Sequence, residues 1–337
     1  MVQGRGGFQL GRRRRRSRWL AGVAGVVAVA AVWGSVPATA AAGASGTARV
    51  AYAGSLQYLN EHTIGPAFTT ATGDAYQGQG AGSLALSQEI RAGEISPNVF
   101  ESVGAAPITA LQPKFTSWYV SVASSPIVVA YNPKTSRGAE LAAIAKGKKP
   151  LSDLFKLMSR DSLLIGRTDP NTDPQGQAFY EMVELAQSYL HLPKGTAGKV
   201  LGSLDNPSQV FAETELEARL QAGQLDVASA YLSQAIQLHL PYIALPSAIN
   251  FGSPSLASRY AKARITLSNG TTAHGVPLIV DVTTIGQTDA GAAQAFVAYL
   301  LSPAGRRSFK AGGYHLVSPK AYGTDVPATV RRAMAQA

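Results

Sequence analysis

The sequence predicts an α/β protein of two lobes, between which the chain crosses twice. From about residue 48 onward, short β-rich runs alternate with helical segments, which is typical of α/β folds with parallel sheets. Two long extended runs, Trp118–Tyr131 and Val276–Val282, bracket the middle of the chain, and Pro126 interrupts the first of them. Two extended crossings are what a hinged pair of lobes requires. We therefore expect one lobe from 48–127 plus 280–337 and another from 128–279.

The predicted elements follow in chain order. The strands, besides the two crossings, are Arg49–Ala53, Ala75–Gln79, Asn98–Val103, Leu163–Arg167, Val227–Tyr231 and segments around Ile243 and Ile265. The helices are one that ends near Thr72, then Leu84–Ala92, Leu151–Met158, Gly176–Leu190, Glu213–Ala222, Ala290–Leu301 and Pro303–Ala311. Gly93 is expected to close the second helix at its C′ position, and the chain is expected to end in an extended tail.

A repeated tetrapeptide marks two matching strand–helix junctions. Ala-Gly-Ser-Leu occurs around Ser55 and again around Ser83, each time between a β-rich run and a helical segment. At a helix start the first N–H groups lack partners and the macrodipole is positive, which favours an anion. Gly54 and Gly82 let an anion approach the backbone, and the serines add hydroxyl donors. The duplication favours a shared oxyanion site, and the alternative is that each serine is only an N-cap.

Residues 1–42 predict an export signal or an N-terminal anchor. Arg12–Arg16 and Arg18 form a cationic start, Trp19–Trp33 is apolar and uncharged, and Pro37–Ala42 offers small-residue cleavage sites. The arginine-rich start is similar to a twin-arginine signal, and the general secretory route is the alternative. The apolar run is close to the shortest length that spans a bilayer, so an uncleaved anchor stays open as well. Either interpretation places the protein outside the cytoplasm, in a periplasm or on the outer face of the cytoplasmic membrane.

Charge and composition exclude several classes of protein. The net charge is +10, but seven of the basic residues are arginines before residue 43, where there is no acid, so residues 43–337 carry only about +3. A nucleic-acid-binding protein would need basic residues clustered on its folded part. Cysteine is absent, which excludes a disulfide framework, a Cys-based metal site, a thiol nucleophile and a lipid-modified cysteine.

The motifs do not indicate an enzyme. The run Gly80–Leu84 fails the G-x-S-x-G pattern because its serine sits one position late. The histidines are dispersed and form no H-E-x-x-H pair. The glycines around Gly80 resemble a nucleotide-binding loop but lack the Lys-Ser/Thr ending. We therefore predict a binding protein without a cofactor.

A set of motifs in a fixed order resembles the molybdate/tungstate-binding proteins of ABC importers, which are extracellular solute-binding proteins. The motifs are Ala53–Leu56, Gly82–Leu84, Trp118–Val120, Ile127–Tyr131, Ile165–Gly176, Gly223–Asp226, Tyr242–Pro246 and Ile249–Gly252. The resemblance is strongest to the tungstate-binding branch and covers about residues 48–318. It implies a type II periplasmic-binding-protein fold that holds the oxyanion between its lobes and delivers it to the membrane permease subunits of the importer.

The resemblance also implies roles for single residues. Ser55 and Ser83 match serines that donate hydrogen bonds to the anion from the first lobe. Asp173 matches a carboxylate that approaches the metal centre of the anion, and Tyr231 matches a cleft tyrosine of the second lobe. Where the tungstate-binding branch has a second glutamate, this chain has Ala230. This departure favours simple tetrahedral recognition over six-coordinate binding.

The residues leave alternatives open beside these roles. Asp173 directly precedes Pro174, so the duty of a helix N-cap explains it equally well. Tyr231, at a strand end, fits a core position as well as a ligand-facing one. The same fold could bind sulfate, phosphate or a ferric complex, or serve as a membrane-anchored sensory domain. For each of these we expect a monomer that binds a small ligand and no nucleic acid.

Overall fold

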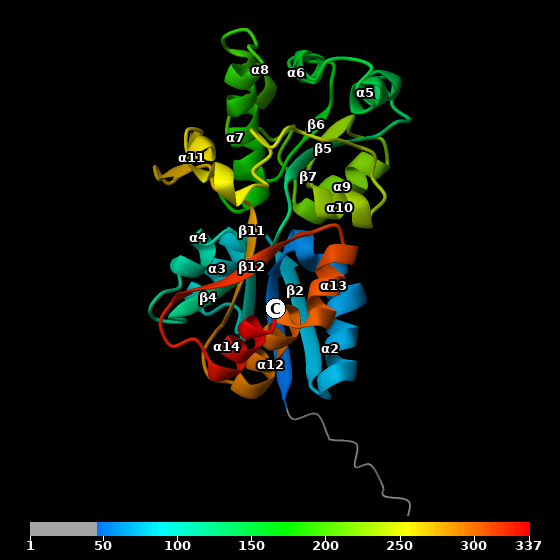
Figure 1. Cartoon of the computed structure of the whole chain (residues 1–337). Coiled ribbons are helices and arrows are strands. Elements are labelled where there is room, and N and C mark those ends of the chain that lie inside the picture. Colours follow the sequence, from blue (N-terminus) through cyan, green and yellow to red (C-terminus); the bar gives the residue numbers. More distant parts are fainter. Residues whose placement is uncertain (1–45) are drawn as a thin grey trace, which may run out of the picture. The chain divides into compact units, whose positions relative to one another are not determined.

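The computed structural model describes residues 46–337, which form two larger sheets, a small two-stranded sheet and the helices around them (Figure 1). The predicted signal or anchor at residues 1–42 lies outside the described residues. The first sheet has the strand order β12-β4-β11-β3-β1-β2, and the second has the order β6-β7-β5-β8. We call each sheet with its helices a lobe. None of the helices in 46–337 is both long and apolar enough to cross a membrane.

The bounds of the strands are as follows. The first sheet contains β1 (Thr47–Ala53), β2 (Ala75–Ala81), β3 (Val99–Val103), β4 (Trp118–Ser124), β11 (Ile279–Thr284) and β12 (His315–Gly323). The second sheet contains β5 (Ile127–Tyr131), β6 (Ile165–Gly166), β7 (Val227–Tyr231) and β8 (Tyr242–Ile243). A separate two-stranded sheet pairs β9 (Arg264–Thr266) with β10 (Thr272–His274).

The helices are distributed between the lobes along the chain. The first lobe carries a helical segment from Gly54 to Thr72 (η1, Gly54–Leu56; α1, Gln57–Leu59; η2, Asn60–Ile64; α2, Gly65–Thr72), then α3 (Ser83–Ala92), α4 (Ala106–Thr109), α12 (Ala290–Leu301), α13 (Pro303–Ala311) and α14 (Ala328–Ala335). The second lobe carries α5 (Gly138–Ala145), α6 (Ser152–Met158), α7 (Pro174–Tyr189), α8 (Thr196–Leu201), α9 (Glu213–Gln221), α10 (Leu232–Gln237), η3 (Pro254–Leu256) and α11 (Ala257–Tyr260).

Several predicted elements agree closely with the structure. The strand β7 and the helices α12 and α13 have the predicted bounds, and Gly93 ends α3 in the left-handed conformation with φ of 77°. The predicted extended tail is wrong in its last part, because the chain after β12 folds into α14. Val330 of α14 is fully buried and belongs to the main hydrophobic cluster, so its burial holds this last helix against the first lobe.

The expectation of parallel sheets is also wrong in part. In the first sheet β1 pairs in parallel with β2 and β3, but β11 and β12 run antiparallel to their neighbours. In the second sheet only β6 and β7 are parallel. The physical reason is the double crossing. The chain leaves the first sheet along β4 and returns to it along the adjacent β11, and two neighbouring strands that carry the chain in opposite directions must pair antiparallel.

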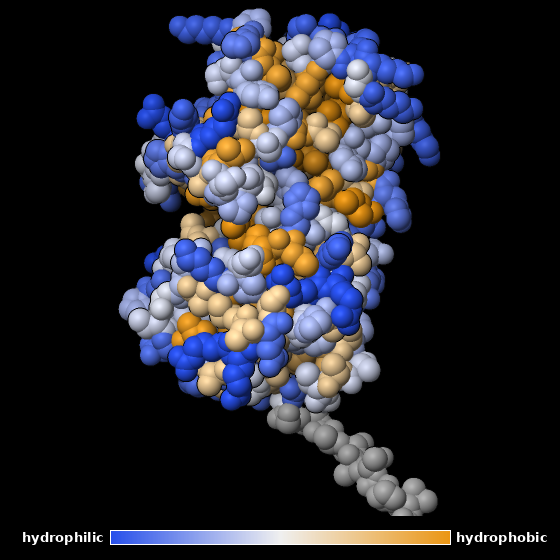
Figure 2. Space-filling model, in the orientation of Figure 1, coloured by the Kyte–Doolittle hydropathy of each residue, from blue (hydrophilic) through white to orange (hydrophobic). Residues whose placement is uncertain are grey.

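The two crossings touch one another between the lobes. Ser125 and Pro126 separate β4 from β5, and the Ser125 N–H donates to the carbonyl of Leu278 at 3.2 Å. The Leu278 N–H in turn donates to Phe251 O at 2.8 Å. Figure 2 shows apolar residues in this middle region, and further apolar residues on the second lobe above it. The link between the lobes is therefore a pair of hydrogen-bonded segments, as the predicted two-crossing hinge requires.

Glu101 and Asp281 are buried carboxyl groups of the first lobe with raised pKa values. Glu101 of β3 is fully buried and accepts a hydrogen bond from Asn60 Nδ2 at 2.5 Å, and burial raises the pKa of Glu101 to about 7. Asp281 of β11 accepts from Ser121 Oγ at 2.6 Å, and burial likewise raises the pKa of Asp281 to about 7. A raised folded-state pKa stabilises the fold below the unfolded-state pKa, and this contribution is lost as the pH rises through the folded-state value.

We therefore expect the free energy of unfolding to fall between about pH 4.5 and pH 7, by roughly 3 kcal/mol for Glu101 alone. The variant Glu101→Gln should lose this part of the pH dependence, because its amide stays neutral and can donate to Asn60 Oδ1, which has no partner among the described residues. Urea denaturation of both proteins from pH 4 to pH 8 measures the difference. Parallel curves for the two proteins would contradict the assignment.

Candidate functional site

The two copies of the tetrapeptide lie side by side at one edge of the first sheet. β1 and β2 are parallel neighbours, and Ala53 pairs with Ala81 at their last residues. Each strand then leads directly into a helical segment, η1 after β1 and α3 after β2. Because parallel strands end at the same edge, both helix starts face the second lobe together. The two predicted strand–helix junctions therefore lie next to each other in the fold.

The serines of the two junctions are not N-caps. Ala53 and Gly82 occupy the N-cap positions, and neither helix start has a side-chain cap bond. Ser83 is fully buried, and its Oγ accepts the Val103 N–H at 3.2 Å, so the hydroxyl proton of Ser83 stays available to a further acceptor. Ser55 is also buried, and its carbonyl accepts from Tyr314 Oη at 3.0 Å. The N-cap alternative for both serines is wrong.

Gly82 faces the loop that precedes α7 in the second lobe. A Cβ on residue 82 would lie 2.5 Å from Thr172 O and 3.2 Å from the Cβ of Asp173, which real side chains do not tolerate. The Ala85 N–H of the first turn of α3 donates to the same Thr172 carbonyl at 3.1 Å. A glycine is thus required for this contact, in which an oxygen of the second lobe already binds the start of α3.

Gly54 faces Glu213, which sequence reasoning missed as a site residue. A Cβ on residue 54 would lie 2.1 Å from Glu213 Oε2. The other carboxyl oxygen accepts hydrogen bonds from Gln175 Nε2 at 3.0 Å and from Gln234 Nε2 at 2.7 Å. Glu213 is the first residue of α9, where acidic residues are common because they suit the helix dipole, so its sequence position gave no functional signal.

Burial raises the pKa of the Glu213 carboxyl well above its usual range, and the charges of Asp173 and Glu217 raise it further. The Gln234 side chain and the Ser55 backbone N–H oppose this shift, because they stabilise the ionised form. The same first-lobe amide that the repeated motif predicts as an anion donor therefore acts on a carboxyl of the second lobe.

Asp173 caps α7, as its position before Pro174 predicts. Its Oδ1 accepts the Gln175 N–H at 2.8 Å. Burial raises the pKa of Asp173 to about 6, against the lowering effect of the Gln175 N–H. The side chain lies beside Gly82, so one residue serves the helix start and borders the junction.

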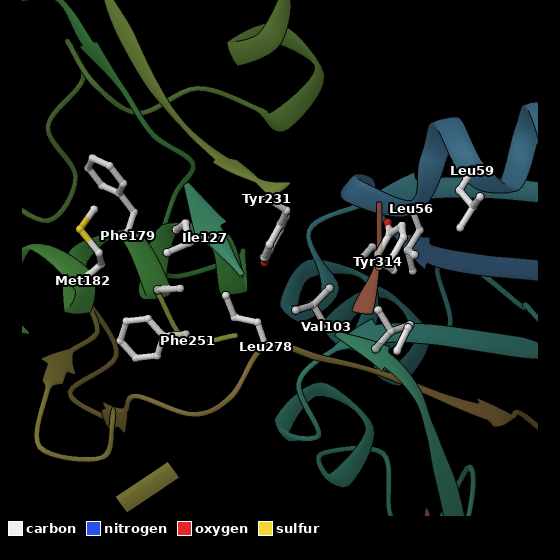
Figure 3. Close-up of a cluster of buried hydrophobic side chains, with 14 of the residues drawn as sticks. Leu56, Leu59, Val103, Ile127, Phe179, Met182, Tyr231, Phe251, Leu278 and Tyr314 are labelled. Atoms are coloured by element: carbon white, nitrogen blue, oxygen red, sulfur yellow. The ribbon is translucent and has the colours of Figure 1, made fainter. Parts of the chain in front are cut away.

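Tyr231 ends β7 and is 2% exposed, and among residues 46–337 its hydroxyl has no hydrogen-bond partner. Burial raises the pKa of this phenol well above its usual value, and the charges of Asp173 and Glu213 add to the effect. Figure 3 shows the ring between the two lobes, with Val103 and Leu278 around it. A buried hydroxyl without a partner costs free energy. The Tyr231 hydroxyl is therefore free to donate a hydrogen bond to a ligand.

Ala230, which the sequence resemblance aligns with a second glutamate of the tungstate-binding branch, lies in an apolar cluster. It pairs with Val128 across β5 and β7, and Leu216 and Leu240 belong to the same cluster. The carboxyl groups near the junctions are instead those of Asp173 and Glu213.

Two cavities flank the contact between Gly54 and Glu213. The larger, of about 450 Å³, is also lined by Gly82, Thr172 and Asp173. The smaller, of about 120 Å³, is also lined by Ser55, Gln57 and Gln234. Neither lining, all of it from described residues, contains lysine or arginine. Within 46–337 there is also no group of three or more His, Cys, Asp or Glu side chains that could hold a metal ion. Any anion here would be bound by neutral donors.

Comparison with known proteins shows the family and the fold. Residues 48–315 match the family described as bacterial extracellular solute-binding protein. A Haloferax volcanii protein provisionally named an ABC transporter molybdenum-binding protein is 32% identical over 283 residues, which cover 84% of this chain and 86% of that protein. The molybdate/tungstate-binding protein WtpA of Pyrococcus abyssi is 28% identical over 239 residues, covering 65% of this chain and 68% of that one.

A solved structure shares the fold. The periplasmic molybdate-binding protein of Azotobacter vinelandii superposes with a TM-score of 0.54 at 17% identity and covers 80% of this chain and 99% of that one. The predicted fold class, a type II periplasmic-binding-protein fold of two α/β lobes, is confirmed.

The Asp173 side chain should stabilise the start of α7. We expect Asp173→Ala to lower the free energy of unfolding by about 0.5–2 kcal/mol relative to Asp173→Asn, because asparagine keeps an acceptor for the Gln175 N–H and alanine does not. Thermal and urea denaturation at pH 7 measure both variants under the same charge state of residue 173. Equal stabilities would show that the hydrogen bond at 2.8 Å contributes nothing.

Proposed function

The chain belongs to the bacterial extracellular solute-binding proteins, which serve transporters and are not enzymes, and we propose that it captures molybdate or tungstate between its lobes and delivers it to the permease subunits of an ABC importer. We further propose that it acts as a monomer outside the cytoplasm, with residues 1–42 as its export signal or anchor. The named relatives supply the chemical class of the ligand.

One observation carries this proposal. Two glycine-serine helix starts stand side by side, because Ala53 pairs with Ala81, and Tyr231, whose ring lies between the lobes (Figure 3), has a hydroxyl without a partner among the described residues. We assign the anion to this place, with Ser55 and Ser83 as hydroxyl donors and Gly54 and Gly82 as the sites of close backbone approach.

The second lobe contributes the remaining groups. Tyr231 is proposed to donate its hydroxyl to the anion, since the phenol is buried and unpaired among the described residues. Asp173 is proposed to border the anion while it caps α7. We place the lobe boundaries at 48–127 plus 280–337 and at 128–279, with closure about the two hydrogen-bonded crossings.

Neutral donors are sufficient for such a ligand. Five to seven charge-assisted hydrogen bonds at about 1.5–3 kcal/mol each give a gross of roughly 8–20 kcal/mol. Association costs at least about 4 kcal/mol of this. Affinities from micromolar to nanomolar are thus accessible without an arginine in the site.

Calorimetric titration of the purified protein with molybdate, tungstate, sulfate and phosphate tests the function. We expect dissociation constants from about micromolar to nanomolar for molybdate and tungstate, and much weaker binding of the other two. The fold admits other oxyanions, so tighter binding of sulfate or phosphate would overturn the proposed ligand but not the fold.

The serine donors can be tested one at a time. We expect Ser55→Ala and Ser83→Ala each to weaken molybdate binding by about 1–3 kcal/mol, since each removes a donor to a buried charge. Ser87→Ala is a matched control on α3, because the Ser87 hydroxyl is buried and donates to Pro107 O at 2.7 Å, one turn further from the junction. If all three folded variants bind like the wild type, the serines have only structural roles.

A further inference from the structure

Both helix starts that are proposed to hold the anion already contact an oxygen of the second lobe. At the α3 start, the Ala85 N–H donates to Thr172 O at 3.1 Å. At the other start, Glu213 Oε2 lies so close to Gly54 that a Cβ there would come within 2.1 Å of it. The Glu213 contact differs from the Thr172 contact, because a side chain can move away while its backbone stays in place.

The carboxyl group of Glu213 lies among hydrogen-bond donors of the kind that an oxyanion needs. One carboxyl oxygen accepts from the amide groups of Gln175 and Gln234, at 3.0 and 2.7 Å, and the Ser55 backbone N–H favours the ionised form. Ser229 Oγ donates to Gln175 Oε1 at 2.6 Å, which turns the Gln175 NH₂ group toward the carboxyl. Three neutral donors from both lobes thus converge on this carboxyl group.

We propose that the Glu213 carboxyl is an internal competitor of the oxyanion: it binds the Gly54–Ser55 junction from the second lobe and must leave it before the anion can bind there. This inference rests on the proposed function, since the competition is for the same first-lobe donors. It makes Glu213 a residue that sets the affinity of the site without being a ligand of the anion.

The structure gives the displaced side chain room to move. Glu213 and Gly54 both line the cavity of about 450 Å³ and the cavity of about 120 Å³. A change of the Glu213 side-chain rotamer leaves the backbone of α9 in place and breaks only side-chain contacts, among them the hydrogen bonds from Gln175 and Gln234. Leaving the junction frees the Ser55 amide and moves the carboxyl away from the bound charge.

The competition has a quantitative consequence. If the competent state, with Glu213 displaced, makes up only a fraction of the protein, the observed dissociation constant exceeds the intrinsic one by the inverse of that fraction. Removal of the competitor should improve the affinity for every anion of the same shape and charge by the same factor. Molybdate and tungstate should therefore gain equally.

Calorimetric titrations of wild type, Glu213→Ala, Glu213→Gln and the control Glu215→Gln test the proposal. We expect Glu213→Ala to bind molybdate and tungstate at least about tenfold more tightly than wild type, with Glu213→Gln between the two. Glu215 lies on the same helix, lines the larger cavity and pairs with Arg219 at 2.7 Å, so Glu215→Gln removes a charge near the site but leaves the Glu213 contact with Gly54 in place. It should bind within about twofold of wild type.

A folded Glu213→Ala protein that binds no more tightly than wild type would overturn the inference. An equal gain in affinity in Glu215→Gln would also overturn it, because the gain would then come from the loss of any negative charge near the site. Small-angle scattering without added anion supplies a second measurement. There Glu213→Ala should be more open than wild type, because the carboxyl no longer links the lobes. If wild type binds neither anion, the proposed function fails, and equal scattering curves for the two proteins would then overturn the inference by themselves.

Discussion

The parallel pairing of β1 with β2 is the constraint on which the rest of the site depends. It places Ala53 opposite Ala81, so that two helix starts with the same sequence open at one edge of the sheet. Glycine follows the strand at both places, and both glycines admit atoms of the second lobe to distances at which a Cβ would clash. A shift of register by one residue would separate the junctions and remove their common target.

Local sequence patterns predict the two-lobe fold and the first-lobe part of the candidate site. The Ala-Gly-Ser-Leu repeat, the break at Pro126 and the amphipathic run of α12 each carry a signal within a few residues. The contact between Gly54 and Glu213 joins positions far apart in the chain, and a glutamate at the start of a helix looks like an ordinary helix residue. The antiparallel strands were missed for a similar reason, since pairing between β4 and β11 follows from the path of the chain and not from either strand.

The second lobe holds its polar groups in place through amides. Gln234 accepts the Tyr231 N–H at 2.9 Å and donates to both Glu213 and Glu217 at 2.7 Å. Because an amide carries a donor and an acceptor in fixed positions, it orients a carboxyl group and a strand end at the same time. A network of this kind lets several buried carboxyl groups coexist, since Glu213 and Glu217 both receive a donor from Gln234. Burial raises the pKa of both groups, and the charges of Asp173 and Glu217 raise that of Glu213 further.

The crossing between the lobes has a mechanical consequence. Ser125 and Leu278 are joined by a hydrogen bond, and Leu278 is joined to Phe251, so the two connecting segments form a narrow ribbon and not two independent tethers. A ribbon bends readily across its thin dimension but resists shear and stretching, because those motions would slide the bonded backbones past each other. From this arrangement we expect the lobes to move relative to each other mainly by bending at the ribbon. Glu213 contacts both lobes at a distance from the ribbon. A contact at that distance opposes opening of the lobes more strongly than an equal contact beside the ribbon would.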